Sequence, residues 1–279
     1  MDKLRIGMIS YSNLYPIFWA LRNHCDCSRY EFVNSYPSAL NRMLREGAVD
    51  VSPSSSIEYL RDESAYGFIE GHSISSHGRI GSIFLFSRVP MESLAGHEVY
   101  ATHQSETSVG LLRIILSEVA KITVEIKTTE APINEALHMH SAYLSIGDEA
   151  LMAGSEVHWS GLNEHGYRVA SMGLQMFYVY DLGELWYKLT GKPFVFALWI
   201  FRRDLAPEKN RLLLRLSADL NRAKEIAIRS LPEIAQTEGV IMPAEGLVDY
   251  WRQIDYDLGD ENLEGLELFR NKLKGIGMI

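Results

Sequence analysis

The chain has 279 residues, of which 47% are apolar and 23% are charged, the usual mixture of a folded globular protein. At roughly 150 residues per domain, this length predicts one large domain or two of ordinary size. The formal net charge is −9, and no basic stripe interrupts this excess of acids. Nucleic acid and anionic membrane surfaces are therefore excluded as expected partners.

Membrane and secreted classes also lose support. The longest uninterrupted apolar run, 194–201, has eight residues, far fewer than the ~20 of a membrane helix. The first twenty residues contain charges and lack the longer apolar core and cleavage site of a secretory signal. Cys25 and Cys27 are one residue apart, a spacing that suits neither a relaxed disulfide nor a C-x-x-C motif. We expect a cytoplasmic protein with inert thiols.

Up to about residue 90, short apolar runs alternate with segments of helical period, the pattern typical of βαβ units around a parallel sheet. The strands predicted here are 4–9, 31–34, 49–52, one that ends at Ile69, and 79–86. Helices are predicted after Asn13 and over 37–45, where Pro37 stands at the start and Gly47 follows the end.

The same alternation starts again after Pro90. It predicts strands at 98–102, 123–127 and 142–146, with helices over about 107–118 and from Ile133. The apolar run 194–201 predicts a central strand, and the segments after it are helical, because leucines recur there at three- and four-residue steps. Together these elements predict an α/β protein with two lobes and a central ligand cleft.

Three turns after predicted strands are rich in hydroxyl and amide groups. They are Ser10-Tyr11-Ser12-Asn13, Ser54-Ser55-Ser56 and Ser105-Glu106-Thr107-Ser108. Helix starts offer unpaired N–H groups and a positive dipole end, so these turns favour a small anionic ligand. The alternative is ordinary helix capping, for which the same residue types are preferred. Asp148 and Asp181 leave a similar choice open, between a general base and an N-cap.

The usual catalytic motifs are absent. The sequence contains no G-x-x-x-x-G-K-[ST], no G-x-G-x-x-G after the first strand, no G-x-S-x-G and no H-E-x-x-H. The nine histidines are scattered, and His138 and His140 would point to different faces of a helix. We therefore expect neither a metal nor an organic cofactor. These patterns indicate a small-molecule cleft without separating an enzyme from a binding protein.

At these residues the chain resembles the chorismate dehydratase family of the futalosine route to menaquinone, whose members share the type II periplasmic-binding-protein fold. The resemblance covers most of residues 1–201 and rests on seven blocks in the family's order. The blocks are Ser10-Tyr11-Ser12-Asn13 with Pro16; Gly47 to Asp50 with Ser56-Ile57-Glu58-Tyr59; Ile74 to Gly78 with Gly81-Ser82-Ile83; Ser105 to Val109; Ile146 to Leu151; Asp181-Leu182-Gly183 with Trp186; and Thr190-Gly191 through Pro193 to Trp199. One departure is that the family usually has Tyr-Leu-Asn-Thr where this chain has Ser12 before Asn13 and Leu14 after it.

The resemblance implies that lobe I comprises 1–88 plus 200–279 and lobe II comprises 89–199. It implies loss of water from chorismate to give 3-[(1-carboxyvinyl)oxy]benzoate, without metal or cofactor. The family pattern assigns catalysis to Asn13 and Ser82. The residues expected to bind substrate are Tyr11, Ser56, Ser105, Thr107, Ser108, Gly147 and Asp148.

The chemistry of these side chains limits their roles. An amide is not basic near neutral pH, so Asn13 is expected to orient the substrate by hydrogen bonding. Ser82 has no adjacent histidine to activate it. We hypothesise that the substrate's own enolpyruvyl carboxylate removes the proton. Two alternatives stay open: the sister enzyme 1,4-dihydroxy-6-naphthoate synthase, and a non-catalytic solute-binding protein for a small anion.

Overall fold

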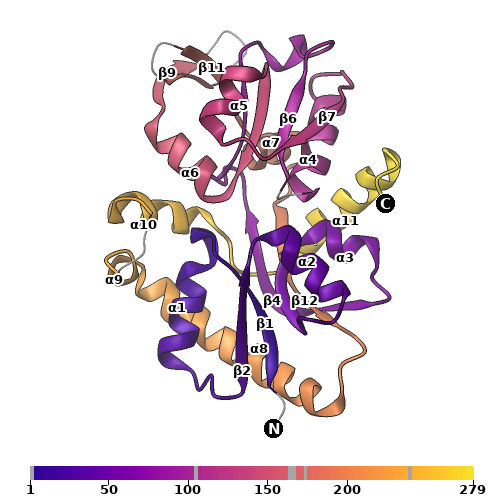
Figure 1. Cartoon of the computed structure of the whole chain (residues 1–279), viewed down its shortest axis with the longest axis vertical. Helices are drawn as coiled ribbons and strands as arrows, with labels where there is room; N and C mark the ends of the chain where they lie inside the picture. The colour runs from indigo at the N-terminus through magenta and orange to yellow at the C-terminus, as the bar shows by residue number, and fades with distance from the viewer. Residues whose placement is uncertain (1–2, 104–105, 163–167, 173–174, 238–240) are drawn as a thin grey trace. The chain divides into compact units, whose positions relative to one another are not determined.

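The strands of the protein form two separate mixed sheets in the computed structural model, which describes residues 3–103, 106–162, 168–172, 175–237 and 241–279 (Figure 1). The chain divides into two compact units. The first contains Met1–Ser75 and Val195–Leu263, and the second contains Ser76–Phe194 and Glu264–Ile279. These bounds differ from the predicted lobes at 76–88, 195–199 and 264–279. Residues 83–87 pair in the second unit's sheet, whereas residues 197–201 pair in the first unit's sheet.

The sheet of the first unit has the strand order β2-β1-β3-β12-β4. Its strands are β1 (Leu4–Ile9), β2 (Tyr30–Ser35), β3 (Val51–Ser55), β4 (Tyr66–Ser76) and β12 (Phe194–Arg202). Strand β1 runs parallel to β2 and β3, whereas β12 runs antiparallel to β3. The strand predicted at 4–9 and the buried strand predicted at 194–201 are confirmed.

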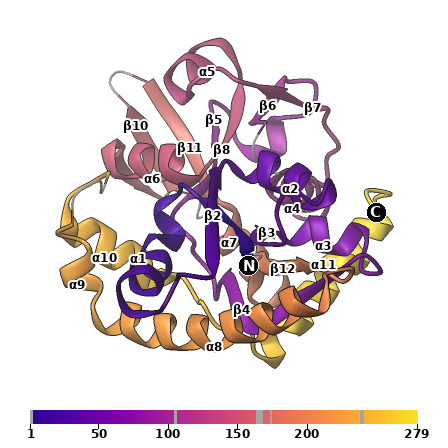
Figure 2. The same cartoon turned by 60° about the horizontal axis from the view of Figure 1, so that its bottom comes forward.

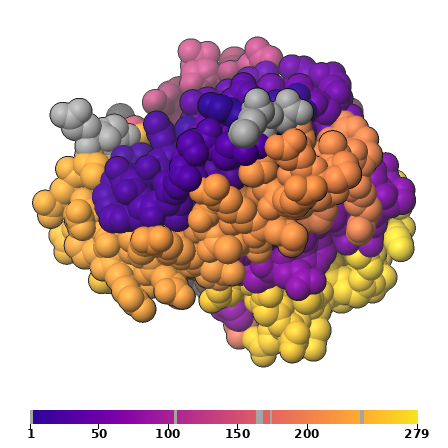
Figure 3. All heavy atoms as spheres, turned by 90° about the horizontal axis from the view of Figure 1, so that it is seen from below, coloured from indigo at the N-terminus to yellow at the C-terminus, as the bar shows by residue number. Residues whose placement is uncertain are grey.

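Helices cover the sheet of the first unit. They are η1 (Ser12–Leu14), α1 (Tyr15–His24), α2 (Pro37–Arg45), α3 (Ser56–Arg61), α8 (Pro207–Arg229), α9 (Leu231–Ile234) and α10 (Ala244–Gln253). Helix α1 packs along α8, as Figures 1 and 2 show. Figure 3 shows the atoms of α8 in orange lying against the indigo N-terminal segment. The predicted leucine stripe is confirmed, because Leu212, Leu216 and Leu220 are buried on α8.

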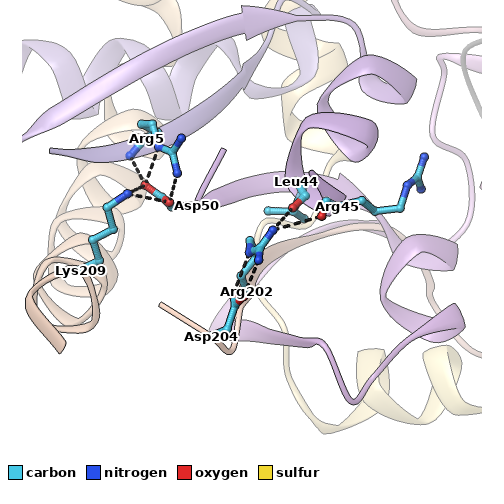
Figure 4. Close-up of polar contacts among 7 residues, drawn as sticks. All are labelled: Arg5, Leu44, Arg45, Asp50, Arg202, Asp204 and Lys209. Atoms are coloured by element: carbon cyan, nitrogen blue, oxygen red, sulfur yellow. Dashed lines mark hydrogen bonds and ion pairs between the residues drawn. The ribbon is translucent and has the colours of Figure 1, made fainter. Parts of the chain in front are cut away.

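A buried ion cluster joins three elements of the first unit. Asp50, just before β3, accepts hydrogen bonds from the backbone N of Arg5 at 2.9 Å and from its Nη2 at 2.6 Å (Figure 4). Lys209 of α8 reaches the same carboxylate at 2.7 Å. Hydrogen bonds from Arg5 and Lys209 hold the pKa of the Asp50 carboxyl below its ordinary value, although burial alone would raise it. Asp50 therefore ties β1 and α8 to the start of β3.

The sheet of the second unit has the order β7-β6-β8-β5-β11-β10-β9. Its strands are β5 (Ile83–Ser87), β6 (Val99–Thr102), β7 (Ile126–Thr129), β8 (Ala142–Ile146), β9 (His158–Leu162), β10 (Arg168–Met172) and β11 (Gln175–Asp181). The β7-β6-β8 part is parallel, and β5, β11, β10 and β9 continue it in antiparallel fashion.

The helical elements of the second unit are η2 (Met91–Ser93), α4 (Glu106–Glu118), α5 (Ile133–Met139), α6 (Gly147–Glu156), α7 (Leu182–Thr190) and most of α11 (Asp260–Gly275). One apolar cluster gathers residues of α5, α6 and the sheet, among them Phe84, Phe86 and Phe177. An aromatic cluster joins α7 and α11 through Trp186, Phe194 and Phe269, with Phe194 and Phe269 ring centroids 4.7 Å apart. These clusters give the second unit a hydrophobic core of its own.

Candidate active site

In the first unit, the predicted site residues lie beyond one edge of the sheet. Strands β1 and β3 are parallel, so their carboxyl ends meet at the same edge. Tyr11 and Asn13 follow β1, and Ser56 follows β3 as the first residue of α3. Carboxyl ends of strands are where α/β proteins bind ligands, so this edge is the candidate site of the first unit.

The turn that contains Asn13 is anchored through its backbone. Trp251 Nε1 donates a hydrogen bond to the carbonyl of Ser12 at 2.7 Å, and the Tyr256 hydroxyl donates to the carbonyl of Asn13 at 2.6 Å. Burial raises the pKa of the Tyr256 hydroxyl well above its ordinary value, so this donor stays protonated. The backbone of the turn is therefore fixed while the Asn13 side chain is left for other contacts.

Two of the predicted residues at this edge have a polar atom without a partner among the described residues. Among the described residues, no donor or acceptor reaches the buried Oδ1 of Asn13 or the buried Oγ of Ser56. An unpaired buried polar atom costs free energy unless a ligand or water satisfies it. Both residues were predicted to contact substrate, and their unpaired atoms are what such a contact requires.

In the second unit, the predicted residues also gather at one edge. Strands β6 and β8 are parallel, and each is followed by a helix, α4 and α6 respectively. Strand β5 is antiparallel to β8, so it begins where β8 ends. This edge therefore has Ser82, Thr107, Ser108, Gly147 and Asp148. The predicted residue Ser105 lies outside the described residues.

A backbone hydrogen bond brings two of these predicted positions together. The N–H of Gly147 donates to the carbonyl of Ser82 at 2.9 Å, where Ile83 of β5 faces Ile146 of β8. Gly147 has φ of 65°, a left-handed conformation that costs glycine little. Ser82 is 4% exposed, so its hydroxyl lies in a largely desolvated environment. Thr107 and Ser108, at the start of α4, are buried as well.

The structure distinguishes between the two interpretations of Asp181. Its side chain accepts from the backbone N of Glu184 at 3.1 Å, which confirms it as the N-cap of α7. It also accepts from the backbone N of Gly81 at 2.8 Å. Burial raises the pKa of the Asp181 carboxyl, and these backbone donors oppose that rise. Asp148 is half-buried in the first turn of α6, whose N-cap is Ile146, so the N-cap interpretation of Asp148 is wrong and its role in substrate binding stays a prediction.

The anchoring residues Trp251 and Tyr256 were not predicted from the sequence. They are 239 and 243 positions from the residues whose carbonyls they bind. A backbone carbonyl is present at every position, so no spacing or motif indicates which one a distant tryptophan or tyrosine contacts. Only the folded arrangement of the first unit identifies this pair.

Metal and membrane features were searched over the same described ranges. No three or more His, Cys, Asp or Glu side chains in them are grouped so that they could hold a metal ion. None of the helices in these ranges is both long enough and apolar enough to cross a membrane. Cys25 and Cys27 are free, half-buried thiols whose pKa burial raises, which agrees with their interpretation as inert.

Comparisons with known proteins agree with the predicted fold class. A protein of Archaeoglobus fulgidus with 16% identity superposes with a TM-score of 0.73 and covers 99% of this chain and 98% of its own. The alkanesulfonate-binding protein of Xanthomonas axonopodis pv. citri gives a TM-score of 0.68 with 15% identity, over 100% of this chain and 94% of its own. A Candida albicans protein described as having the generic periplasmic binding protein fold gives 0.63 with 9% identity, over 100% and 91%. The α/β fold with two sheets is thus of the periplasmic-binding-protein type.

Sequence comparisons are more specific. Chorismate dehydratase of Thermus thermophilus is 29% identical over 270 residues, which is 96% of this chain and 94% of that protein. A family model described as menaquinone biosynthesis matches residues 4–274, nearly the whole chain. The protein therefore belongs to the menaquinone biosynthesis family.

Proposed function

We propose that the protein is a chorismate dehydratase, a carbon–oxygen lyase that removes water from chorismate to form 3-[(1-carboxyvinyl)oxy]benzoate. The observation that supports this most directly is the similarity to the Thermus enzyme over 96% of the chain. The activity would lie in the futalosine route to menaquinone, in the cytoplasm. Each unit is proposed to supply polar side chains to the substrate.

The reaction needs the removal of one proton and the departure of one hydroxyl group. The C–H bond at ring carbon 3 breaks, and its electrons pass through the conjugated double bond toward the ring carboxylate. The C–O bond at carbon 4 then breaks, and hydroxide leaves and takes up a proton to become water. Because the ring becomes aromatic, the step is strongly downhill, and catalysis consists mainly of positioning and charge stabilisation.

We assign the proton acceptor to the enolpyruvyl carboxylate of the substrate. The side chains proposed for catalysis, Asn13 and Ser82, are neutral hydrogen-bonding groups with no basic role near neutral pH. Asn13 offers Nδ2 as a donor to a carboxylate and its unpaired Oδ1 as an acceptor for a substrate hydroxyl. The buried hydroxyl of Ser82 would donate to developing negative charge where water competes little.

The remaining polar groups of the substrate are assigned to both units. Tyr11 and Ser56 are proposed as substrate-binding residues of the first unit. In the second unit, the proposed substrate-binding residues are Ser105, Thr107, Ser108, Gly147 and Asp148. Support for this assignment is that the described members gather at the ligand-binding edge of each sheet.

The test is an assay of the purified full chain with chorismate, in which the benzoate-type product is followed by ultraviolet absorbance and chromatography. We expect product formation well above the spontaneous decay of chorismate, and its near loss in Asn13→Ala. Asn23→Ala is the matched control, because Asn23 is exposed on α1 and its Nδ2 donates to the carbonyl of Trp19 at 2.8 Å. Saturable binding without turnover would identify a binding protein instead. Turnover of cyclic dehypoxanthinyl futalosine would identify a naphthoate synthase.

A further inference from the structure

Asp181 is a buried carboxylate for which the proposed reaction has no direct use. It is 3% exposed and lies at the end of β11, next to β5 in the sheet. Three backbone N–H groups donate to it, from Ile80 at 3.1 Å, Gly81 at 2.8 Å and Glu184 at 3.1 Å. The nearest described cation is Arg79, with Nε at 3.8 Å. The carboxylate therefore fastens residues 80 and 81 to the start of α7.

The segment it fastens, which we call the 78–82 turn, needs such an anchor. Gly78 and Gly81 have φ of 115° and 75°, conformations that glycine reaches easily and leaves easily. Residues 80 and 81 give their N–H groups to Asp181 instead of to a neighbouring strand. Without that carboxylate, two buried donors in a glycine-containing turn would be unpaired.

Gly183 brings α7 close enough to the same turn. A Cβ at this position would lie 2.5 Å from the carbonyl oxygen of Gly78 and 2.9 Å from Oγ of Ser76. That carbonyl is itself held by the Ser76 hydroxyl at 2.8 Å. A side chain at 183 would thus displace the 78–82 turn, since backbone atoms cannot move aside singly.

We propose that Asp181 is a positioning residue, which with Gly183 fixes the 78–82 turn and so aims the Ser82 hydroxyl at the substrate. Ser82 is then held on both sides. Asp181 accepts the N–H groups of the two residues before Ser82, and the N–H of Gly147 donates to the carbonyl of Ser82 at 2.9 Å. The role assigned to Ser82 rests on the proposed function. The hold of Asp181 on the turn does not, and it can be measured separately.

The kinetic test is a double-mutant cycle in the full chain. Asp181→Asn keeps the volume but replaces one acceptor oxygen with an NH₂ group facing backbone donors. We expect kcat for chorismate to fall about 10- to 100-fold, the effect of losing one or two charge-assisted hydrogen bonds. In a Ser82→Ala background the same change should cost less than about threefold, because the hydroxyl it positions is gone. A merely structural role would slow both backgrounds equally.

The matched control is Thr190→Val, at the other end of α7, where the hydroxyl bonds the carbonyl of Trp186 at 2.8 Å. It should change kcat less than about twofold in either background. Gly183→Ala provides an independent variant, which applies the same test should Asp181→Asn fold poorly. Equal losses in the parent and in the Ser82→Ala background, or an Asp181→Asn enzyme as fast as the parent, would overturn the proposal.

Amide hydrogen exchange separates this proposal from the proposed function. The amides of Ile80 and Gly81 should be protected in the parent and exchange at least about tenfold faster in Asp181→Asn, with no change in Thr190→Val. If the parent does not turn over chorismate while this difference appears, the proposed function fails and the anchored turn stands. If exchange at both amides is unchanged by Asp181→Asn, the positioning role is refuted whatever the substrate.

Discussion

Asp50 belongs to a block shared with the resembled family, and the structure gives it a role in folding the first unit. Its side chain is 3% exposed and accepts bonds from Arg5 and Lys209, whose side chains are 31% and 18% exposed. Removing one member of a buried ion cluster costs about 3 to 5 kcal/mol. Both cations are partly solvated here, so we take the lower limit, about 3 kcal/mol, for Asp50→Asn.

A loss of about 3 kcal/mol predicts a Tm lower by about 6 to 12 °C, at 2 to 4 °C per kcal/mol. The matched control is Asp204→Asn, which removes the ion pair between Arg202 and Asp204, also drawn in Figure 4. Asp204 is 65% exposed, and solvent screening leaves an exposed pair with little effect on stability. Thermal unfolding followed by circular dichroism compares the two variants, and urea unfolding gives the free energies.

The pH dependence adds a second measurement. The pKa of Asp50 is lower in the folded chain than in the unfolded chain, so its stabilisation is present above the unfolded pKa of about 4. It is lost as pH falls through the folded pKa. The difference in free energy of unfolding between the parent and Asp50→Asn should therefore have its full value at pH 7 and shrink below about pH 4. An Asp50→Asn protein no less stable than Asp204→Asn would refute the role of the cluster.

Four further outcomes test the site and the fold. Asn13→Asp places a carboxylate near that of the substrate, where two charges ~4 Å apart repel by about 4 kcal/mol at an effective dielectric of ~20, so turnover should fall up to about a thousandfold. Asn13→Ala should be severely impaired as well, and Asp148→Asn should lose less activity. An Asn13→Asp enzyme as fast as the parent would exclude the substrate as base. Tyr256→Phe should lower kcat/KM about tenfold, because the Asn13 carbonyl loses its donor, and an unchanged value would mean that the turn is held without it. Burial, with the charge of Lys224, lowers the pKa of His72 to about 4, so the free energy of unfolding should fall by up to about 3 kcal/mol between pH 6.5 and pH 4, and by less in His72→Gln. Urea unfolding at several pH values measures this, and an equal fall in both proteins would contradict the prediction. Activity should survive a strong chelator, and a lost rate restored by one divalent ion would overturn the metal-free mechanism.

Local sequence signals predicted most elements of the first unit. The strand expected to end at Ile69 was wrong at its end, since β4 continues to Ser76. The strand at 4–9 and the helix at 37–45 have the predicted bounds, because an apolar run and an initial proline act within the element itself. The prediction of a strand over 79–86 was wrong at its start, since β5 begins only at Ile83. The preceding residues give their N–H groups to Asp181, about 100 positions away.

The second unit shows where periodicity is insufficient. The antiparallel strands β9, β10 and β11 were not predicted, and β9 is exposed along its whole length, so it lacks the alternation that marks a half-buried strand. The sheets are mixed, whereas the alternation of strands and helices predicted parallel ones. Strand direction depends on how distant segments pair, and a local pattern contains no information on that pairing.

The residues that the family resemblance marks have different physical roles. Asp50 ties β1 and α8 to β3, and Asp181 ties the 78–82 turn to α7, although both are aspartates just outside or at the end of a strand. The oxygens of each carboxylate already accept several structural N–H groups. Asn13 and Ser56 are the opposite case, with buried oxygens that no described protein group satisfies. A motif residue whose oxygens already accept hydrogen bonds within the protein is therefore best tested by unfolding measurements and double-mutant cycles. A motif residue with an unpaired buried atom is best tested by substrate turnover.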